Sequence, residues 1–369
     1  NLDQRFIPEK LFNYSDKKIA IIGGGPAGLS CAYYLSCKGY TVTVFEKEAQ
    51  PGGMLMMGIP SYRLEKDVLM AEIDVLKQMG VEIRTGVEVG VDVTIPQLKE
   101  QGYEGFFLAI GAQGGRKLNI EGEDHVDVMA GVDFLKKVNL GENIQTPGKV
   151  IVIGGGNVAI DVARTAVRSG ANEVSMYCLE SLEEMPAQKE EIAEATEEKI
   201  QIENGWGPKR IVIENNKLVG VEFIRCVSVF NQDGKFDPKY DEQNCILVPA
   251  DKVLLSVGQS IQWGNLLEGI DIEIRPNKAV VADPFTLQTK EATIFAGGDV
   301  VTGPKFAIDA IAAGKEGADS LHRAVQEGQD LRLGRNRRIF QTLEKDNVDF
   351  EGYDRFPRTK VTRESSKEN

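Results

Sequence analysis

Two glycine-rich turns, each set between a short apolar strand and a helix, constrain most strongly what this chain can fold into. The first turn, residues 23–28, follows a strand expected over 18–22 and precedes a helix expected over 29–38. A second strand is expected over 41–45 and is followed by Glu46. A G-x-G-x-x-G turn in such a strand–helix–strand unit, with an acid after the second strand, is typical of a dinucleotide-binding Rossmann unit.

The same order of elements returns in the middle of the chain. An apolar strand is expected over 150–153, a helix over about 158–169 and a second strand over 174–177. The turn between the first strand and the helix, residues 154–159, reads G-x-G-x-x-A. Two such units far apart in one chain indicate two nucleotide-binding domains rather than a short structural repeat.

Each glycine of the first turn has a physical purpose. Gly23 permits the tight turn, Gly25 lets the backbone approach a pyrophosphate, and Gly28 lets the helix pack closely on the strand. The N-terminus of the helix directs unpaired N–H groups and partial positive charge toward the phosphates. Glu46 would hydrogen-bond a ribose diol. The residues expected at this site are Gly23, Gly25, Pro26, Ala27, Gly28 and Glu46.

A third glycine motif, Gly297-Gly298-Asp299, lies near the end of the chain. It follows a strand expected over 292–295 and precedes a helix expected over about 307–327. A carboxylate at this place can accept a hydrogen bond from a ribityl hydroxyl, and the N-terminus of the helix would face an isoalloxazine. Far downstream of a dinucleotide fingerprint, the motif predicts FAD held by both ends of the chain.

The second turn is expected to hold a nicotinamide nucleotide. Alanine in place of its third glycine spaces helix and strand slightly apart, a variation seen for such nucleotides. Two dinucleotides in one chain predict hydride transfer between a nicotinamide and a flavin. That step needs alignment of stacked cofactors rather than a general base, so no catalytic side chain is assigned. The residues expected at this turn are Gly154, Gly156, Asn157, Val158 and Ala159.

The composition excludes several other classes of protein. The chain has 43 Lys plus Arg against 56 Asp plus Glu, and this net charge of −13 argues against a duplex-DNA binder. Its five cysteines form no C-x-x-C pair, so neither a zinc site nor an iron–sulfur cradle is expected within it. No apolar run reaches the ~18 residues of a membrane-spanning helix, and the charged N-terminus does not resemble a signal peptide. We therefore expect a cytoplasmic protein.

The ordered motifs resemble a known family of FAD- and NAD(P)-binding subunits. This family is typified by the glutamate synthase small subunit. It includes the large subunit of NADH-dependent ferredoxin:NADP oxidoreductase and the nucleotide-binding part of dihydropyrimidine dehydrogenase. Besides the three glycine motifs, the resemblance rests on Gly52-Gly53-Met54, Gly58-Ile59-Pro60, Tyr62-Arg63-Leu64, residues 107–112, Asp161, Met185-Pro186 and Gly258-Gln259.

The resemblance implies an α/β fold with two Rossmann-like dinucleotide-binding domains of the pyridine-nucleotide reductase type. The FAD domain is expected to be discontinuous, 1–114 and 284–340, with the NAD(P) domain over 115–283 and an extended tail over 341–369. The segment 52–64 is expected to lie along the FAD. By resemblance, Gly53, Met54, Arg63, Gly111, Gly298 and Asp299 join the FAD site, and Glu180, Gly258 and Gln259 join the NAD(P) site.

One departure from the family pattern bears on the choice of nucleotide. Family members that use NADPH typically carry two arginines six residues before Met-Pro, and here those positions are Leu179 and Glu180. A carboxylate would repel a 2′-phosphate and accept a hydrogen bond from a 2′-hydroxyl, so NADH is preferred over NADPH. The alternative is that Glu180 is a solvated surface acid and that Lys189 or Arg164 contacts the phosphate.

The expected function is a flavoprotein electron-transfer subunit. It would move hydride between NAD(P)(H) and FAD and pass electrons to iron–sulfur clusters or ferredoxin in a larger complex, of which electron-bifurcating enzymes are one kind. The [4Fe–4S] clusters are expected in a flanking segment or a partner subunit. Disulfide-reductase chemistry is not expected, because the redox C-x₄-C pair that related disulfide reductases carry after the second strand is missing here. The alternatives are a stand-alone or glutamate-synthase-type NAD(P)H:acceptor oxidoreductase and a non-catalytic scaffold subunit that contains FAD.

Overall fold

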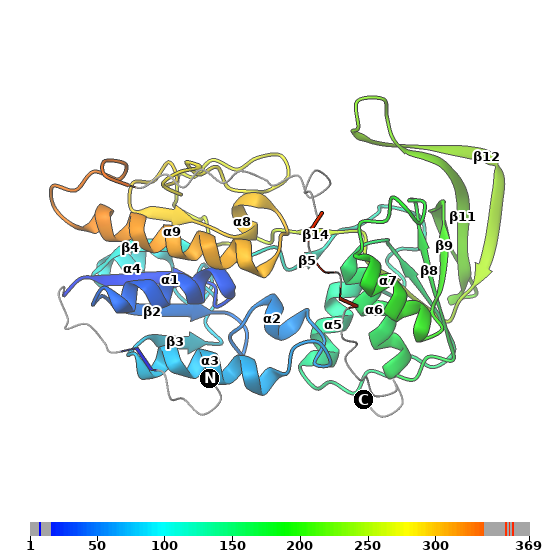
Figure 1. Ribbon diagram of the computed structural model, residues 1–369, viewed down its shortest axis with the longest axis horizontal. Helices are drawn as coiled ribbons and strands as arrows, with labels where there is room; N and C mark the ends of the chain where they lie inside the picture. The colour runs from blue at the N-terminus through cyan, green and yellow to red at the C-terminus, as the bar shows by residue number, and fades with distance from the viewer. Residues whose placement is uncertain (1–6, 9–15, 336–350, 353, 355, 358–369) are drawn as a thin grey trace.

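The computed structural model describes residues 7–8, 16–335, 351–352, 354 and 356–357. Within these residues the chain forms two α/β units placed side by side, each built on a five-stranded parallel sheet (Figure 1). The parallel-sheet α/β class expected from the sequence is confirmed. The tail expected over 341–369 lies almost wholly outside the described residues.

The first sheet has the strand order β15-β4-β1-β2-β3. Its strands are β1 (Lys18–Ile22), β2 (Thr41–Glu46), β3 (Glu82–Thr85), β4 (Tyr103–Leu108) and β15 (Ile294–Ala296). The helices of this unit are α1 (Pro26–Cys37), α2 (Met54–Met57), α3 (Lys66–Gln78), α4 (Ile95–Glu100), α8 (Asp299–Thr302) and α9 (Ala307–Val325).

Apolar side chains on both faces explain why β1 lies at the centre of this sheet. Ile19 and Ile21 join a buried cluster with residues of α1, α3 and α9, whereas Ala20 and Ile22 join a second cluster on the opposite face. Successive strand residues point to opposite faces, so a strand covered on both sides is apolar throughout. The strand β15 pairs in parallel with β4, so segments from both ends of the chain complete one sheet.

The second sheet has the strand order β6-β13-β7-β8-β9. Its strands are β6 (Val128–Ala130), β7 (Lys149–Ile153), β8 (Glu173–Cys178), β9 (Gln201–Asn204) and β13 (Lys252–Leu255). The helices α5 (Gly131–Asn139), α6 (Asn157–Arg168) and α7 (Lys189–Glu197) contribute to the core on one face. The opposite face packs against an antiparallel sheet of β10 (Trp206–Glu214), β11 (Lys217–Phe230) and β12 (Phe236–Pro249).

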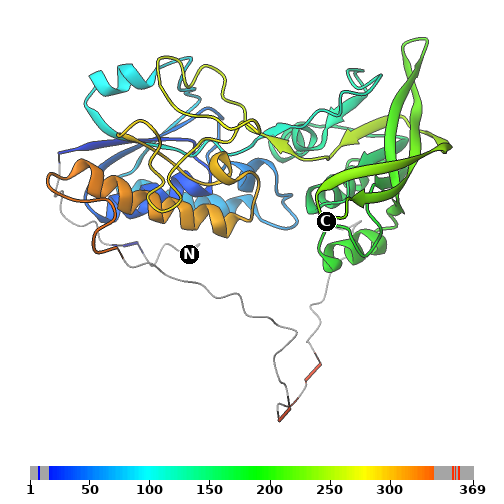
Figure 2. The ribbon, with the colours of Figure 1, turned by 90° about the horizontal axis from the view of Figure 1, so that it is seen from above.

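The strands β11 and β12 form a long hairpin that projects from the second unit (Figures 1 and 2). Most residues of β12 before Cys245 are polar, yet this segment forms a strand from Phe236 onward. Pairing with β11 supplies the backbone hydrogen bonds of this polar strand. A partner strand therefore outweighs the weak intrinsic preference of such residues for extended structure.

The two units are joined by a short antiparallel ladder. The strand β5 (Gly114–Gly115) leads into the second unit, and β14 (Gln259–Ser260) leads back. After this return, Ile261, Leu266 and Val280 pack into the core of the first sheet. Among the described residues, no helix is both long and apolar enough to cross a membrane.

Helices α1 and α9, which come from opposite ends of the chain, pack closely at Gly314. The closeness of this packing can be tested by adding one methyl group there. A Cβ atom at Gly314 would lie 2.2 Å from the carbonyl oxygen of Ala27. We expect Gly314→Ala to destabilise the protein by about 1–3 kcal/mol, because overpacking outweighs the ~1 kcal/mol that alanine contributes to a helix. Denaturant unfolding measures this, with Ala312→Ser on the exposed face of α9 as the control. An increase in stability would contradict the close packing.

Candidate dinucleotide-binding sites

The first glycine turn is shaped by close backbone contacts. Gly23 has a φ of +107°, and a Cβ there would lie 2.4 Å from the carbonyl oxygen of Ala109. A Cβ at Gly28 would lie 2.0 Å from the carbonyl oxygen of Gly23. Neither position can hold a side chain without backbone movement, which is the physical reason for glycine in this motif.

The side chain of Glu46 closes back onto this turn. Its carboxylate accepts hydrogen bonds from the backbone N–H of Gly24 at 2.7 Å and of Glu48 at 2.8 Å. Burial raises the pKa of the Glu46 carboxyl, against the opposing effect of the two N–H donors. The residue expected to bind a ribose therefore lies at the carboxyl ends of β1 and β2, beside a narrow pocket that Val87 and Trp263 also line.

A second pair of glycines, Gly52 and Gly53, packs against the residues that precede α1. The N–H of Gly52 donates to the carbonyl of Gly24 at 2.8 Å. A Cβ at Gly53 would lie 2.8 Å from the Cα of Gly25, whereas a Cβ at Gly25 would meet only Gly53, at 3.7 Å. The expected FAD residues Gly25 and Gly53 are thus neighbours, and Met54 follows them as the first residue of α2.

The motif Gly297-Gly298-Asp299, from the other end of the chain, also lies beside the start of α1. Gly298 has a φ of +78°, and a Cβ there would lie 3.0 Å from the Cβ of Ala27. Asp299 begins α8, and burial raises the pKa of its carboxyl. Gly111 follows β4 with a φ of +67° and open space around its Cβ position. Apart from Arg63, the structure therefore brings the expected FAD residues together around the N-terminus of α1 and the carboxyl end of β4.

The second turn has the same geometry at the start of α6. A Cβ at Gly154 would lie 2.4 Å from the carbonyl oxygen of Ser256, and Ala159 is fully buried. Nothing lies within 4 Å of a Cβ at Gly156. The side-chain oxygen of Asn157 accepts a hydrogen bond from the backbone N–H of Gln188 at 2.8 Å, so this oxygen is already engaged within the protein.

The acid of the second site lies at a different position from Glu46 relative to its strand. The strand position that matches Glu46 is Cys178, since Phe45 pairs with the end of β1 as Tyr177 pairs with the end of β7. Burial raises the pKa of the Cys178 thiol to about 12. Glu180 lies two residues further on, and its carboxylate comes within 2.9 Å of a Cβ built on Gly155.

Asn204 at the end of β9 holds the segment from Cys178 to Glu180 in place. Its side-chain N–H donates to the carbonyl of Glu180 at 3.0 Å and to the Cys178 sulfur at 3.2 Å. Sequence reasoning did not find Asn204, because it follows no motif and its role depends on the pairing of β8 with β9. Gly258 and Gln259, also expected at this site, lie at the ladder between the units, where the Gly258 carbonyl accepts from the N–H of Arg116.

Arg63 is directed away from the FAD residues. Its guanidinium donates to Asp161 on α6 at 2.8 Å and forms an ion pair with Glu191 on α7. Both partners belong to the second unit, and the assignment of Arg63 to the FAD site, which the resemblance implied, stays a prediction. In the sequence, Asp161 entered only as one of the residues that carry the family resemblance.

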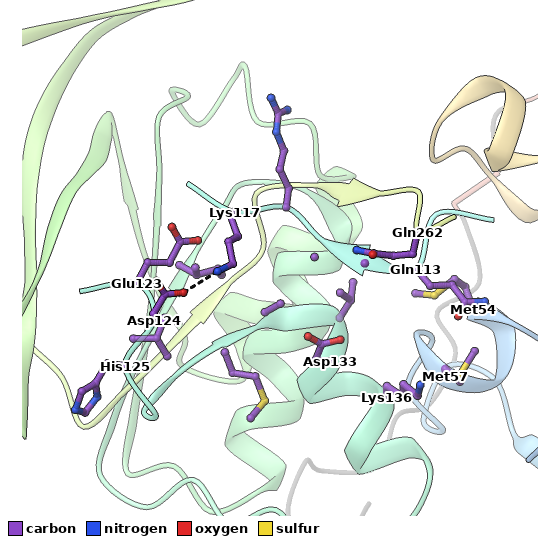
Figure 3. Close-up of a pocket in the computed structure, with 18 of the residues that line it drawn as sticks. Met54, Met57, Gln113, Lys117, Glu123, Asp124, His125, Asp133, Lys136 and Gln262 are labelled. Carbon is purple, nitrogen blue, oxygen red and sulfur yellow. Dashed lines mark hydrogen bonds and ion pairs between the residues drawn. The ribbon is translucent and has the colours of Figure 1, made fainter. Parts of the chain in front are cut away.

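A cavity of about 490 Å³ lies between the two units (Figure 3). The first unit contributes Met54 and Met57 from α2, and the second contributes Asp133 and Lys136 from α5. Residues in or next to the connecting ladder also line the cavity, among them Gln113, Gly114, Gly115 and Gln262. A cavity of this size lined from both units is where two bound molecules could meet.

Comparison with known proteins gives close relatives. The chain is 39% identical over 318 residues to the NADP(+)-dependent formate dehydrogenase subunit beta of Moorella thermoacetica, which covers 85% of this chain and 45% of that protein. It is 35% identical to the NAD-dependent dihydropyrimidine dehydrogenase subunit PreT of Escherichia coli, over 84% of this chain and 68% of that one. It is 32% identical to the glutamate synthase [NADPH] small chain of Escherichia coli, over 86% and 73%. The chain thus spans about half the length of the formate dehydrogenase subunit.

Solved structures agree on the fold. FprA of Mycobacterium tuberculosis, determined in complex with NADPH, superposes with a TM-score of 0.72 over 84% of this chain and 85% of that one, at 18% identity. The resemblance to the glutamate synthase small subunit and dihydropyrimidine dehydrogenase is confirmed by the relatives above. A family model for pyridine nucleotide-disulphide oxidoreductases matches residues 17–328, and the chain belongs to this family of oxidoreductases.

Proposed function

We propose that this chain is a flavoprotein electron-transfer subunit that moves hydride between a nicotinamide dinucleotide and FAD. The observation that carries the proposal is the repeated site. Each parallel sheet ends in a glycine turn with a carboxylate behind it, Glu46 in one unit and Glu180 in the other, and the two units line one cavity. A bound flavin and nicotinamide supply the redox chemistry, and the protein aligns them and excludes water.

The first unit fits FAD. The open backbone beside Gly25 and Gly53 suits a pyrophosphate at the N-terminus of α1, and the pocket beside Glu46 suits an adenosine ribose. Asp299 is available to a ribityl hydroxyl. We propose that the FAD domain consists of residues up to about 113 together with those from about 261 onward. A return earlier than residue 284 is supported by Ile261 and Val280, which belong to the core of the first unit.

The second unit fits a nicotinamide dinucleotide, with its diphosphate at the start of α6. The open space beside Gly156 is where phosphate oxygens would approach the backbone. We propose that electrons pass onward to iron–sulfur clusters or ferredoxin, in a flanking segment or a partner subunit of a hetero-oligomeric complex. Relatives named as subunits of formate dehydrogenase and glutamate synthase support this. A cytoplasmic location is part of the same proposal, supported by five cysteines that form no disulfide.

Reduction of the flavin tests the proposed function. When the protein reconstituted with FAD is mixed with NADH without oxygen, we expect loss of the visible absorption band of oxidised flavin. We expect Gly156→Val to raise the half-saturating NADH concentration at least about tenfold, because its side chain enters the phosphate space, whereas FAD content and melting temperature stay unchanged. A wild-type flavin that NADH does not bleach would favour the scaffold alternative instead.

The relatives differ in their nucleotide, since two are named for NADP(+) or NADPH and one for NAD. We propose NADH for this chain, because the Glu180 carboxylate lies beside Gly155 of the second glycine turn, and a carboxylate there would repel a 2′-phosphate. Arg164 is fully engaged with Glu194 and Glu198, and this argues against its use for a phosphate contact.

Substitution of Glu180 tests this preference. We expect the wild type to have the higher kcat/KM with NADH, and Glu180→Arg to shift the ratio toward NADPH by about ten- to a hundredfold, through removal of repulsion and gain of a phosphate contact. Steady-state kinetics with both nucleotides and an artificial acceptor measure the ratio. Glu183→Arg, on a nearby exposed acid, serves as the control. A wild-type preference for NADPH would contradict the assignment.

A further inference from the structure

Two adjacent side chains of the first unit reach into the second. Tyr62 and Arg63 lie in the connection between α2 and α3. The Arg63 guanidinium bonds to Asp161 at 2.8 Å and pairs with Glu191. Both carboxylates are buried, at 7% exposure, on neighbouring helices of the second unit. Two charged hydrogen bonds from one planar guanidinium fix its orientation as well as its position.

The Tyr62 ring packs on the same surface. The guanidinium groups of Arg164 and Arg168 lie 4.7 Å and 4.1 Å from its centroid. Both arginines are themselves held by Glu198 on the side of α7, at 2.8 Å and 2.6 Å. The second unit therefore presents a cationic surface, ordered by its own ion pairs, to the aromatic ring of the first.

Further polar contacts join α2 and its neighbourhood to α5. Lys136 on α5 pairs with Glu48 at 2.6 Å, and the Asn139 side chain donates to the carbonyl of Met57 at 2.9 Å. The covalent connection is the short ladder of β5 and β14. A polar interface between domains permits relative motion unless particular contacts oppose it. Arg63, Lys136 and Asn139 are thus among the side chains that oppose such motion.

We propose that Tyr62 and Arg63 form a latch between the domains and that Arg63 is a positioning residue for hydride transfer. This inference rests on the proposed function. The latch ties the segment that follows Gly53 to helix α6, whose first residue is Asn157, and these are the two backbones expected to cradle the two cofactors. Hydride transfer needs the reacting atoms within ~3–3.5 Å, and a ~1 Å misplacement can cost about a hundredfold in rate.

Stopped-flow reduction of the FAD-loaded protein by NADH tests the positioning role. We expect Arg63→Gln to lower the rate at saturating NADH by about ten- to a hundredfold, with less than about a twofold change in half-saturation. Arg63→Lys, which keeps the charge but not the fork, should fall between. Asp161→Asn should resemble Arg63→Gln, and the double variant should be no slower than the slower single variant, because both remove one interaction.

The control is Arg84→Gln, which removes an arginine that pairs with Glu82 within the first unit. An unchanged saturating rate in Arg63→Gln overturns the positioning role. A loss confined to NADH affinity also overturns it, because Arg63 would then be a nucleotide contact.

Small-angle X-ray scattering of the protein without nucleotide tests the latch independently of catalysis. We expect a larger radius of gyration for Arg63→Gln than for the wild type and for Arg84→Gln, at equal melting temperature. Equal scattering profiles would overturn the latch. If NADH does not reduce the wild-type flavin, the proposed function fails, while the scattering comparison still decides whether the latch exists.

The pH dependence gives a further test of the ion pair. Burial raises the pKa of Asp161 from 3.8 to about 6; Glu191 acts in the same direction, and Arg63 and Arg164 oppose it. Below about pH 6, Arg63 therefore loses one ionised partner, and the saturating rate of flavin reduction should fall in the wild type but not in Asp161→Asn.

The same shift predicts a sign for stability. Because the folded-state pKa of this acid is raised, its protonation favours the folded state. The free energy of unfolding of the wild type should therefore decline as the pH rises from about 4 to about 6, relative to Asp161→Asn. Urea unfolding across this range measures the difference. Parallel profiles for the two proteins would contradict the assignment.

Discussion

Close contact between backbones at glycine is the constraint on which the rest of the structure depends. Gly28 packs against the carbonyl of Gly23, Gly53 against Gly25, and Gly314 against the carbonyl of Ala27. Side chains at these positions would push apart α1, α2 and α9. Because they meet without side chains between them, three segments distant in sequence converge at the carboxyl end of one sheet. The open backbone that results is what a pyrophosphate requires.

The second unit repeats this arrangement with different chemistry at the end of its second strand. The buried carboxylate of Glu46 is replaced in register by the Cys178 thiol, which its surroundings keep neutral. The negative charge comes instead from Glu180, beyond the strand, with its backbone held by Asn204. One fold thus offers a buried acid behind one glycine turn and a more accessible acid behind the other. This difference suits a permanently held cofactor in one unit and an exchanging nucleotide in the other.

Ion pairs, cation–π contacts and neutral hydrogen bonds join the two units, and the Tyr62-Arg63 motif contributes to them. Tyr62-Arg63 was expected along the FAD, because the segment that contains it follows Gly53. The guanidinium bonds to Asp161 and Glu191 in the second unit. Each of these two buried carboxylates therefore has a cation beside it. Two motifs that are far apart in the chain, one after Gly53 and one within α6, are therefore parts of a single contact.

Several elements follow from local patterns of residues. The continuous burial of β1 after Lys18, the turns at Gly23 and Gly154, and the acid after β2 follow from neighbouring residues, and the structure shows all of them. Only the tertiary structure decided the partner of Arg63, the extension of β12 beyond the body of its sheet and the packing of Ile261 under the first sheet. These features depend on which distant side chains and strands come together. An ion pair or a strand pairing forms only when both partners are present, and the residues between the two partners do not indicate which segments will pair.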